Sequence, residues 1–141
     1  MSTIERAIEI AAKAHAGQVD KGGEPYILHP LRLMLGLTGD NVRMTAVLHD
    51  VVEDTSVTLN DLKEEGFPQE VLEAVAALTK RKGETRLEAA SRASQNPIAR
   101  AVKLADVADN MNLSRIPAPT ERDFARLRQY EEVRQILENA S

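Results

Sequence analysis

The sequence predicts an all-α fold, a compact single-domain helical bundle. Aromatic residues make up only 3% of the 141 residues and tryptophan is absent, so the core must consist of aliphatic side chains and methionine. Such a composition favours packed helices over a β-sandwich, whose strands prefer aromatic and β-branched residues. Apolar residues recur at helical spacing along most of the chain, and we find no β-strand pattern. The length suits one domain, residues 1–141.

The expected helices follow from capping residues and turn residues. Ser2 or Thr3 can cap a first helix over residues 3–16, which Gly17 ends. Pro30 disfavours a helical conformation at the residue before it and opens a second helix, over residues 30–37. Asp40 is expected to cap a long central helix over residues 41–54.

The second half of the chain shows the same signals. Thr58 and Asp61 form the pattern of a capping box, which opens a short helix over residues 58–65. An amphipathic helix is expected over residues 69–78 and a further helix over 85–94, and Asn96 can cap another over 97–113. The last helix covers 120–140. Its expected apolar face consists of Phe124, Leu127, Tyr130, Val133, Ile136 and Leu137.

Charge and composition exclude several classes of function. A net charge of −4 argues against a protein that binds nucleic acid over a broad surface. Without cysteine there is no thiol nucleophile and no disulfide, and a bound metal would need histidine and carboxylate ligands. No apolar stretch approaches the roughly 20 residues that span a membrane, and the N-terminus does not resemble a signal peptide. We therefore expect a cytoplasmic protein without a membrane partner. Its oligomeric state is not indicated.

The most informative stretch is residues 46–54, an apolar segment that carries His49, Asp50, Glu53 and Asp54. Buried charges are costly unless they are paired or bind a metal. On a continuous helix, Asp50, Glu53 and Asp54 share one face, with His49 beside it. These residues therefore predict a metal site in the central helix.

Other segments can supply the remaining ligands. His29 precedes a proline, and residues 101–110 place Lys103, Asp106 and Asn110 on one helical face. Two imidazoles and two carboxylates, from His29, His49, Asp50 and Asp106, would form a mixed site suited to Mn²⁺, Fe²⁺ or Zn²⁺. The third histidine, His15, is expected to be a buried, hydrogen-bonded helix residue.

This ligand pattern resembles that of the HD-domain metal-dependent phosphohydrolases. Further motifs resemble the hydrolase domain of RelA/SpoT proteins, and most of all the stand-alone small alarmone hydrolases. These motifs lie at residues 14–18, 23–30, 49–55, 77–80 and 103–106, followed by Asn110. They occur in order and extend the resemblance over most of the chain.

The resemblance implies an enzyme that removes the 3′-pyrophosphate from (p)ppGpp, giving GDP or GTP and pyrophosphate. It implies Mn²⁺ as the usual cofactor, although another divalent metal could serve, and a small nucleotide as the partner. His29, His49, Asp50 and Asp106 match the metal ligands of the family. Glu53 and Asp54 match its catalytic pair, and Lys21 and Asn110 match residues that contact the substrate.

Two positions depart from the family pattern. The chain has Asp20 and Val107 where the alarmone hydrolases usually carry arginine. The loss of two cations favours an alternative, an HD-type phosphatase or phosphodiesterase that acts on a different nucleotide or phosphorylated metabolite. A second alternative is a non-catalytic nucleotide-binding protein, against which the intact Glu53–Asp54 pair argues.

Overall fold

The computed structural model describes residues 3–112, 116 and 118–140. Within these residues the chain forms nine α-helices and no strand, which confirms the all-α prediction. The helices are α1 (Ile4–Ala14), α2 (Leu28–Gly36), α3 (Asp40–Leu48), α4 (Val51–Asp54), α5 (Leu59–Glu64), α6 (Gln69–Leu78), α7 (Arg86–Ala93), α8 (Pro97–Asn110) and α9 (Glu121–Asn139). No helix in this part of the chain is long and apolar enough to cross a membrane.

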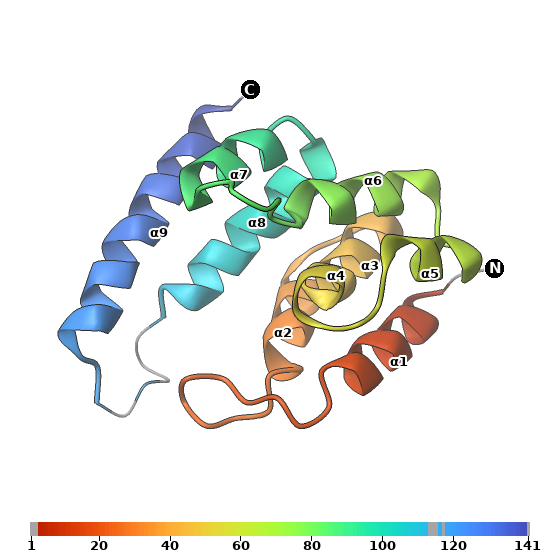
Figure 1. The fold of residues 1–141 in the computed structure, drawn as a ribbon, viewed down its shortest axis with the longest axis horizontal. Coiled ribbons are helices and arrows are strands. Elements are labelled where there is room, and N and C mark those ends of the chain that lie inside the picture. The colour runs from red at the N-terminus through yellow and green to blue at the C-terminus, as the bar shows by residue number, and fades with distance from the viewer. Residues whose placement is uncertain (1–2, 113–115, 117, 141) are drawn as a thin grey trace.

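The helix α3 lies at the centre of the arrangement and packs against α1, α2, α6 and α8 (Figure 1). The helix α8 links two groups of helices, because it contacts α2 and α3 on one side and α9 on the other. The helices α7 and α9 pack against each other and against α8. Residues on α2, α3 and α8 can therefore meet in the interior.

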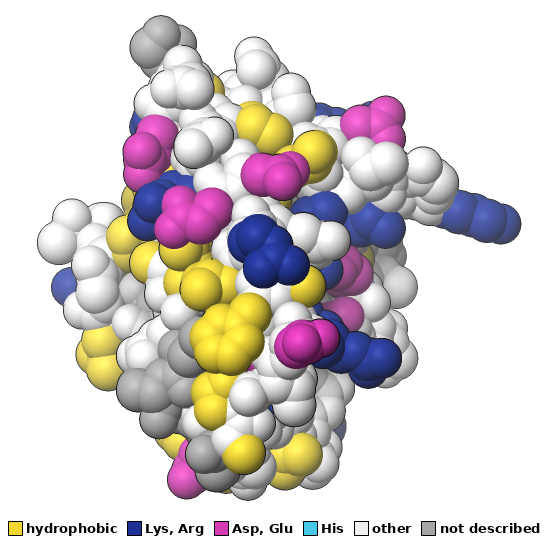
Figure 2. All heavy atoms as spheres, turned by 90° about the vertical axis from the view of Figure 1, so that its left-hand side faces the viewer, with side chains coloured by type: hydrophobic (Ala, Val, Ile, Leu, Met, Phe, Trp, Pro, Cys, Tyr) yellow, Lys and Arg dark blue, Asp and Glu magenta, His cyan; other side chains and the backbone are white. Residues whose placement is uncertain are grey.

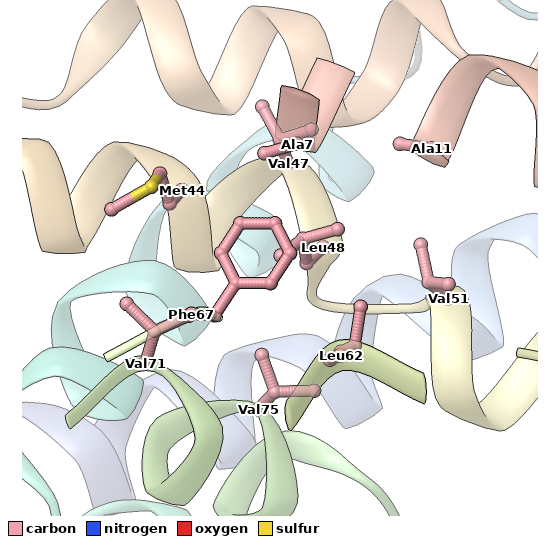
Figure 3. Packing of buried hydrophobic residues seen from close by; sticks show 10 residues of the cluster. All are labelled: Ala7, Ala11, Met44, Val47, Leu48, Val51, Leu62, Phe67, Val71 and Val75. Atoms are coloured by element: carbon pink, nitrogen blue, oxygen red, sulfur yellow. The ribbon is translucent and has the colours of Figure 1, made fainter. Parts of the chain in front are cut away.

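The largest apolar cluster surrounds Leu48, at the end of α3. Phe67 and Val75 pack toward it from the α5–α6 side, and Ala7 and Ala11 approach from α1 (Figure 3). These side chains are at most 4% exposed. A second cluster joins α7, α8 and α9 and consists of Ala90, Val107, Val133 and Leu137. The metal-site candidates lie where these packed groups of helices adjoin.

Most of the expected helix ends are confirmed. The side chain of Thr3 accepts a hydrogen bond from the Arg6 backbone N–H, and Thr58 and Asp61 form the capping box. The helix α6 has the predicted bounds, and Asn96 caps α8. The expected residue 113 lies outside the described residues, and α8 ends at Asn110.

Three helix predictions were wrong. The helix α2 begins before Pro30, because a proline in the first turn needs no intrahelical donor. The expected central helix is divided: α3 ends at Leu48, and α4 begins at Val51 with Asp50 at its N-cap. In a continuous helix the Ala46 carbonyl would accept from the Asp50 N–H, but it accepts from Nδ1 of His49 at 2.7 Å. Glu53 and Asp54 therefore belong to a separate one-turn helix. Asp40 lies inside α3, whose N-cap is Gly39.

The outer helix α9 is only partly amphipathic. Val133 and Leu137 are buried as predicted, but Phe124 is 46% exposed. The first turns of α9 border a cleft that is lined by Leu127 and Tyr130.

Candidate active site

The structure brings the four predicted metal ligands together. One ligand atom from each of His29, His49 and Asp50 lies within 4.8 Å of the other two. Asp106 reaches the same place from α8, where its Oδ1 lies 2.8 Å from Nε2 of His29 and 3.5 Å from Nε2 of His49. His29, His49 and Asp106 are buried, and Asp50 is partly exposed. We call these four candidate ligand residues the metal cluster; the name refers to the side chains and not to a group of ions.

Both histidines are held so that Nε2 faces the cluster. Nδ1 of His49 lies 2.7 Å from the Ala46 carbonyl oxygen, which can only accept, so Nδ1 carries the proton. Nδ1 of His29 lies 2.6 Å from Oδ2 of Asp109, whose carboxylate also accepts two hydrogen bonds from Arg32. Metal-binding histidines are typically anchored in this way through their second nitrogen.

The Nε2 atom of His49 is buried and finds no hydrogen-bond partner among the described residues. It nevertheless lies 3.0 Å from Oδ2 of Asp50. A buried nitrogen that faces two carboxylates requires a proton or a cation between them. The donor set therefore fits a divalent cation.

The electrostatics of the cluster agree with this fit. Burial lowers the pKa of His49, but the carboxylates of Asp50 and Asp106 outweigh burial and raise its pKa well above the ordinary value. Burial raises the pKa of Asp106, but Lys103 and the two histidines outweigh burial, so the pKa lies well below its usual range. The cluster is thus strongly negative when the imidazoles are neutral, and it attracts a cation.

Two clefts flank the metal cluster, and Tyr26, Asn110 and Tyr130 line both. The first cleft, about 280 Å³, lies between the loop after α1 and the helix α9, and includes His29. The second cleft, about 250 Å³, includes His49, Asp50 and Asp106. A molecule bound at the cluster can extend in both directions.

The predicted catalytic pair lies on α4 and lines the second cleft. Oε1 of Glu53 accepts a hydrogen bond of 2.7 Å from the backbone N–H of Lys80, so the connection between α6 and α7 orients this carboxylate. Burial, followed by the charges of Asp50 and Glu53, raises the pKa of Asp54. A carboxyl group with a raised pKa is better suited to accept and return a proton.

The two predicted substrate contacts lie at different depths. Asn110 donates a hydrogen bond of 3.0 Å to Oδ1 of Asp106, so it touches the metal cluster and both clefts. Lys21 lies in the wall of the first cleft, where its Nζ is 3.6 Å from Oδ1 of Asp123 on α9. As predicted, Lys103 and Asp106 share one helical face, and they form an ion pair at 2.9 Å. His15 is buried and pairs with Gln18, as expected.

The two departures from the family pattern have structural roles. Oδ1 of Asp20 accepts hydrogen bonds from the backbone N–H groups of Gly22 and Glu24, at 2.8 and 3.0 Å, and so shapes the loop at the first cleft. Val107 is 1% exposed and packs with Val133 and Leu137. Neither position presents a cation to the clefts.

Sequence reasoning missed the role of Tyr26. Its hydroxyl donates a hydrogen bond to Oδ2 of Asp50, and its ring lies between those of His15 and His29, at 4.9 and 5.6 Å. Burial, followed by the charge of Asp50, raises the pKa of this phenol, which therefore remains a donor. The position three residues before His29, within the same motif, was a usable signal. No such signal pointed to Tyr130 or Arg126 in the clefts.

Comparison with known proteins identifies the family. The model of the HD domain matches residues 7–111. The chain belongs to the HD-domain family. The predicted resemblance is thereby confirmed, and the family implies a divalent metal ion, for which the cluster offers a site.

The chain also resembles individual curated proteins. The chain is 35% identical to a probable GTP pyrophosphokinase of Mycobacterium leprae, over 94% of this chain and 18% of the relative. It is 45% identical to a guanosine-3′,5′-bis(diphosphate) 3′-pyrophosphohydrolase of Haemophilus influenzae, over 57% of this chain and 13% of the relative. This chain thus spans less than a fifth of either relative.

A solved structure resembles the whole chain. It is described as a metazoan ortholog of SpoT that hydrolyzes ppGpp. The TM-score is 0.83 and the identity 26%, and the match covers 100% of this chain and 88% of that one. The arrangement of the nine described helices is therefore similar to that of this solved structure.

Proposed function

We propose that this HD-domain protein is a phosphohydrolase that uses Mn²⁺ and removes the 3′-pyrophosphate from (p)ppGpp. The observation that carries the proposal is the metal cluster, in which the buried Nε2 of His49 has no hydrogen-bond partner among the described residues. The names of the similar proteins support the choice of substrate. They include a 3′-pyrophosphohydrolase and a protein of known structure that is described as hydrolyzing ppGpp.

In this proposal His29, His49, Asp50 and Asp106 hold the ion. A divalent ion there would lower the pKa of a water molecule and polarise a phosphoryl oxygen. Around it, Lys103 and Asn110 keep the Asp106 carboxylate in place through hydrogen bonds of 2.9 and 3.0 Å. The positions of the ligands are thus set by other side chains rather than by the ion alone.

The Glu53–Asp54 pair handles the proton. Water adds to the phosphorus beside the 3′ oxygen, and the bond between that phosphorus and the 3′ oxygen breaks. Glu53, held by the Lys80 N–H, orients the water, and Asp54 accepts its proton and returns one to the departing 3′ oxygen. Lys80 and Arg86 line the same cleft and offer positive charge to the pyrophosphoryl group that is transferred to water.

The decisive experiment is incubation of the purified protein with ppGpp and Mn²⁺, with release of pyrophosphate as the readout. We expect pyrophosphate and GDP in equal amounts, and no release after the metal is removed with EDTA. If the wild-type protein leaves ppGpp intact but cleaves other phosphate esters, ppGpp is not its substrate, although the protein is still a phosphohydrolase.

A different substrate is the second candidate, and Asp20 favours it. Its carboxylate lines the first cleft, where the family usually has a cation. A panel of nucleotides and phosphorylated metabolites, assayed with Mn²⁺, decides between the two candidates by the ratio of kcat/KM for ppGpp to that for each competitor. A non-catalytic nucleotide-binding protein would bind ligands in this panel without turning any over.

A further inference from the structure

Arg126 lines the first cleft and is not paired with an acidic side chain of any described residue, so it can bind an anionic ligand. Among the described residues the cleft has three cationic side chains, from Lys21, Arg32 and Arg126. It also has three acidic ones, from Asp20, Asp109 and Asp123. The charges of these six side chains therefore balance before any ligand enters. Binding of an anionic ligand then requires a cation that is not already paired with a carboxylate.

Two of the three cations are engaged with the protein. Both Nε and Nη2 of Arg32 donate to the carboxylate of Asp109 at 3.0 Å. Nζ of Lys21 lies 3.6 Å from Oδ1 of Asp123. Arg32 also helps hold His29 through Asp109, so it cannot turn to a ligand without loosening the metal cluster.

Arg126 differs from both. Its side chain is half-buried in the wall of the cleft, and it forms no ion pair or side-chain hydrogen bond with any other described residue. It lies three residues after Asp123 on α9, so the two share a helical face, and the ion pair of Asp123 with Lys21 places this face against the loop. A half-buried guanidinium without an anion forfeits hydration that a phosphate would replace.

We propose that Arg126 binds a phosphate of the nucleotide substrate that is not the one being cleaved. The inference rests on the proposed function. His29 and Asn110 line the same cleft as Arg126, so a ligand that reaches Arg126 can also reach the metal cluster. A guanidinium can donate two parallel hydrogen bonds to a phosphate, and the cleft contains no other unpaired cation among the described residues. Arg126 thus supplies from α9 the positive charge that Asp20 does not supply from the loop.

The environment of Arg126 suits a nucleotide rather than inorganic phosphate. Beside it the cleft is lined by apolar and aromatic side chains, from Val19, Ile116, Leu127 and Tyr130. Such a wall can pack against the base or the sugar of a nucleotide. Inorganic phosphate would leave this part of the cleft empty. Figure 2 shows the side of the molecule where α9 lies, with basic, acidic and apolar side chains intermixed. Among the described residues on this side, basic side chains form no continuous surface that would hold a nucleic acid.

The test compares Arg126→Ala with Arg128→Ala. Arg128 lies on the same helix, but it is exposed and lines neither cleft. In assays with ppGpp and Mn²⁺, we expect R126A to raise KM about tenfold with kcat nearly unchanged, as for the loss of one charged hydrogen-bonded contact. Arg126→Lys should recover part of this loss, because it restores the charge without the planar donors. R128A should match the wild type.

A second measurement separates this inference from the proposed function. Equilibrium binding of GDP in the presence of Mn²⁺ requires no turnover. If wild-type protein leaves ppGpp intact but binds GDP, and R126A binds it about tenfold more weakly than R128A, the inference stands and the reaction is a different one. Equal KM values or equal GDP affinities for R126A and R128A, or a wild type that binds no GDP, would overturn the inference.

Discussion

The metal cluster and the first cleft are built in different ways. In the cluster, His29 and Asp106 each take part in two or more side-chain hydrogen bonds, and Nδ1 of His49 is held by the Ala46 carbonyl. The first cleft consists of a loop and the first turns of α9, which among the described residues are joined by the ion pair between Lys21 and Asp123 at 3.6 Å. From this difference we infer that the cluster is held rigidly, whereas residues of the first cleft can change without displacing it.

The largest effect is expected when a metal-binding side chain of the cluster is removed. We expect His49→Ala or Asp50→Ala to abolish Mn²⁺ uptake and turnover, because each removes a donor from a site that cannot be completed by its neighbours. Metal binding is measured by calorimetric titration. His15→Ala is the matched control, since His15 is equally buried but hydrogen-bonds with Gln18 instead of entering the cluster. Loss of metal from folded H15A would mean that damage to the packing, and not to the ligand set, explains the result.

The next effect concerns the catalytic pair. Glu53→Gln retains an oxygen that can accept from the Lys80 N–H, so the connection after α6 should keep its position. We expect Mn²⁺ affinity within about twofold of the wild type and a kcat lower by about 10²-fold or more, as for the loss of a positioned general acid–base group. If kcat survives in a protein that still binds Mn²⁺, Glu53 is not catalytic and Asp54 acts alone.

The metal cluster and the helices around it differ in how well the sequence predicts them. The meeting of the candidate metal ligands could be predicted because buried polar residues within apolar segments have few explanations, and His49 and Asp50 adjoin in the chain. The division between α3 and α4 could not, because it depends on one side-chain hydrogen bond from His49 to Ala46 that competes with the helix. A continuous helix has the same sequence pattern.

The cleft residues were harder still. Arg126 and Tyr130 belong to a helix whose charged and apolar residues read as a solvated face and a packing face. Only the path of α9 across the loop makes them part of the cleft. Asp20 was read as a lost cation, but its two backbone hydrogen bonds could not be inferred from composition. The sequence therefore predicts the chemistry of this fold better than its selectivity.

A third prediction examines the support of the cluster. Tyr26→Phe removes only the hydroxyl that donates to Asp50 and keeps the ring between His15 and His29. Groups that orient metal ligands typically contribute 10- to 100-fold in affinity, and we expect the Kd for Mn²⁺ to rise by about tenfold. Tyr130→Phe is the matched control, because Tyr130 lines both clefts but its hydroxyl forms no hydrogen bond with another described residue. A Kd that rises equally in both variants would mean that the hydroxyl of Tyr26 does not support Asp50.

The smallest expected effect lies in the loop of the first cleft. Asp20→Asn keeps an oxygen for the N–H groups of Gly22 and Glu24, so the loop should retain its shape, but it removes a negative charge from the cleft wall. The KM for ppGpp should fall by a few-fold with kcat unchanged, because a charge in a solvent-exposed cleft is partly screened. The decrease should diminish at high salt, which an effect on loop shape would not. Asp20→Arg is expected to do worse than Asp20→Asn despite its more favourable charge, since arginine cannot accept the two loop hydrogen bonds. A D20R variant with a lower KM than D20N would show that charge outweighs loop geometry, and that selectivity in this cleft can be altered at single positions.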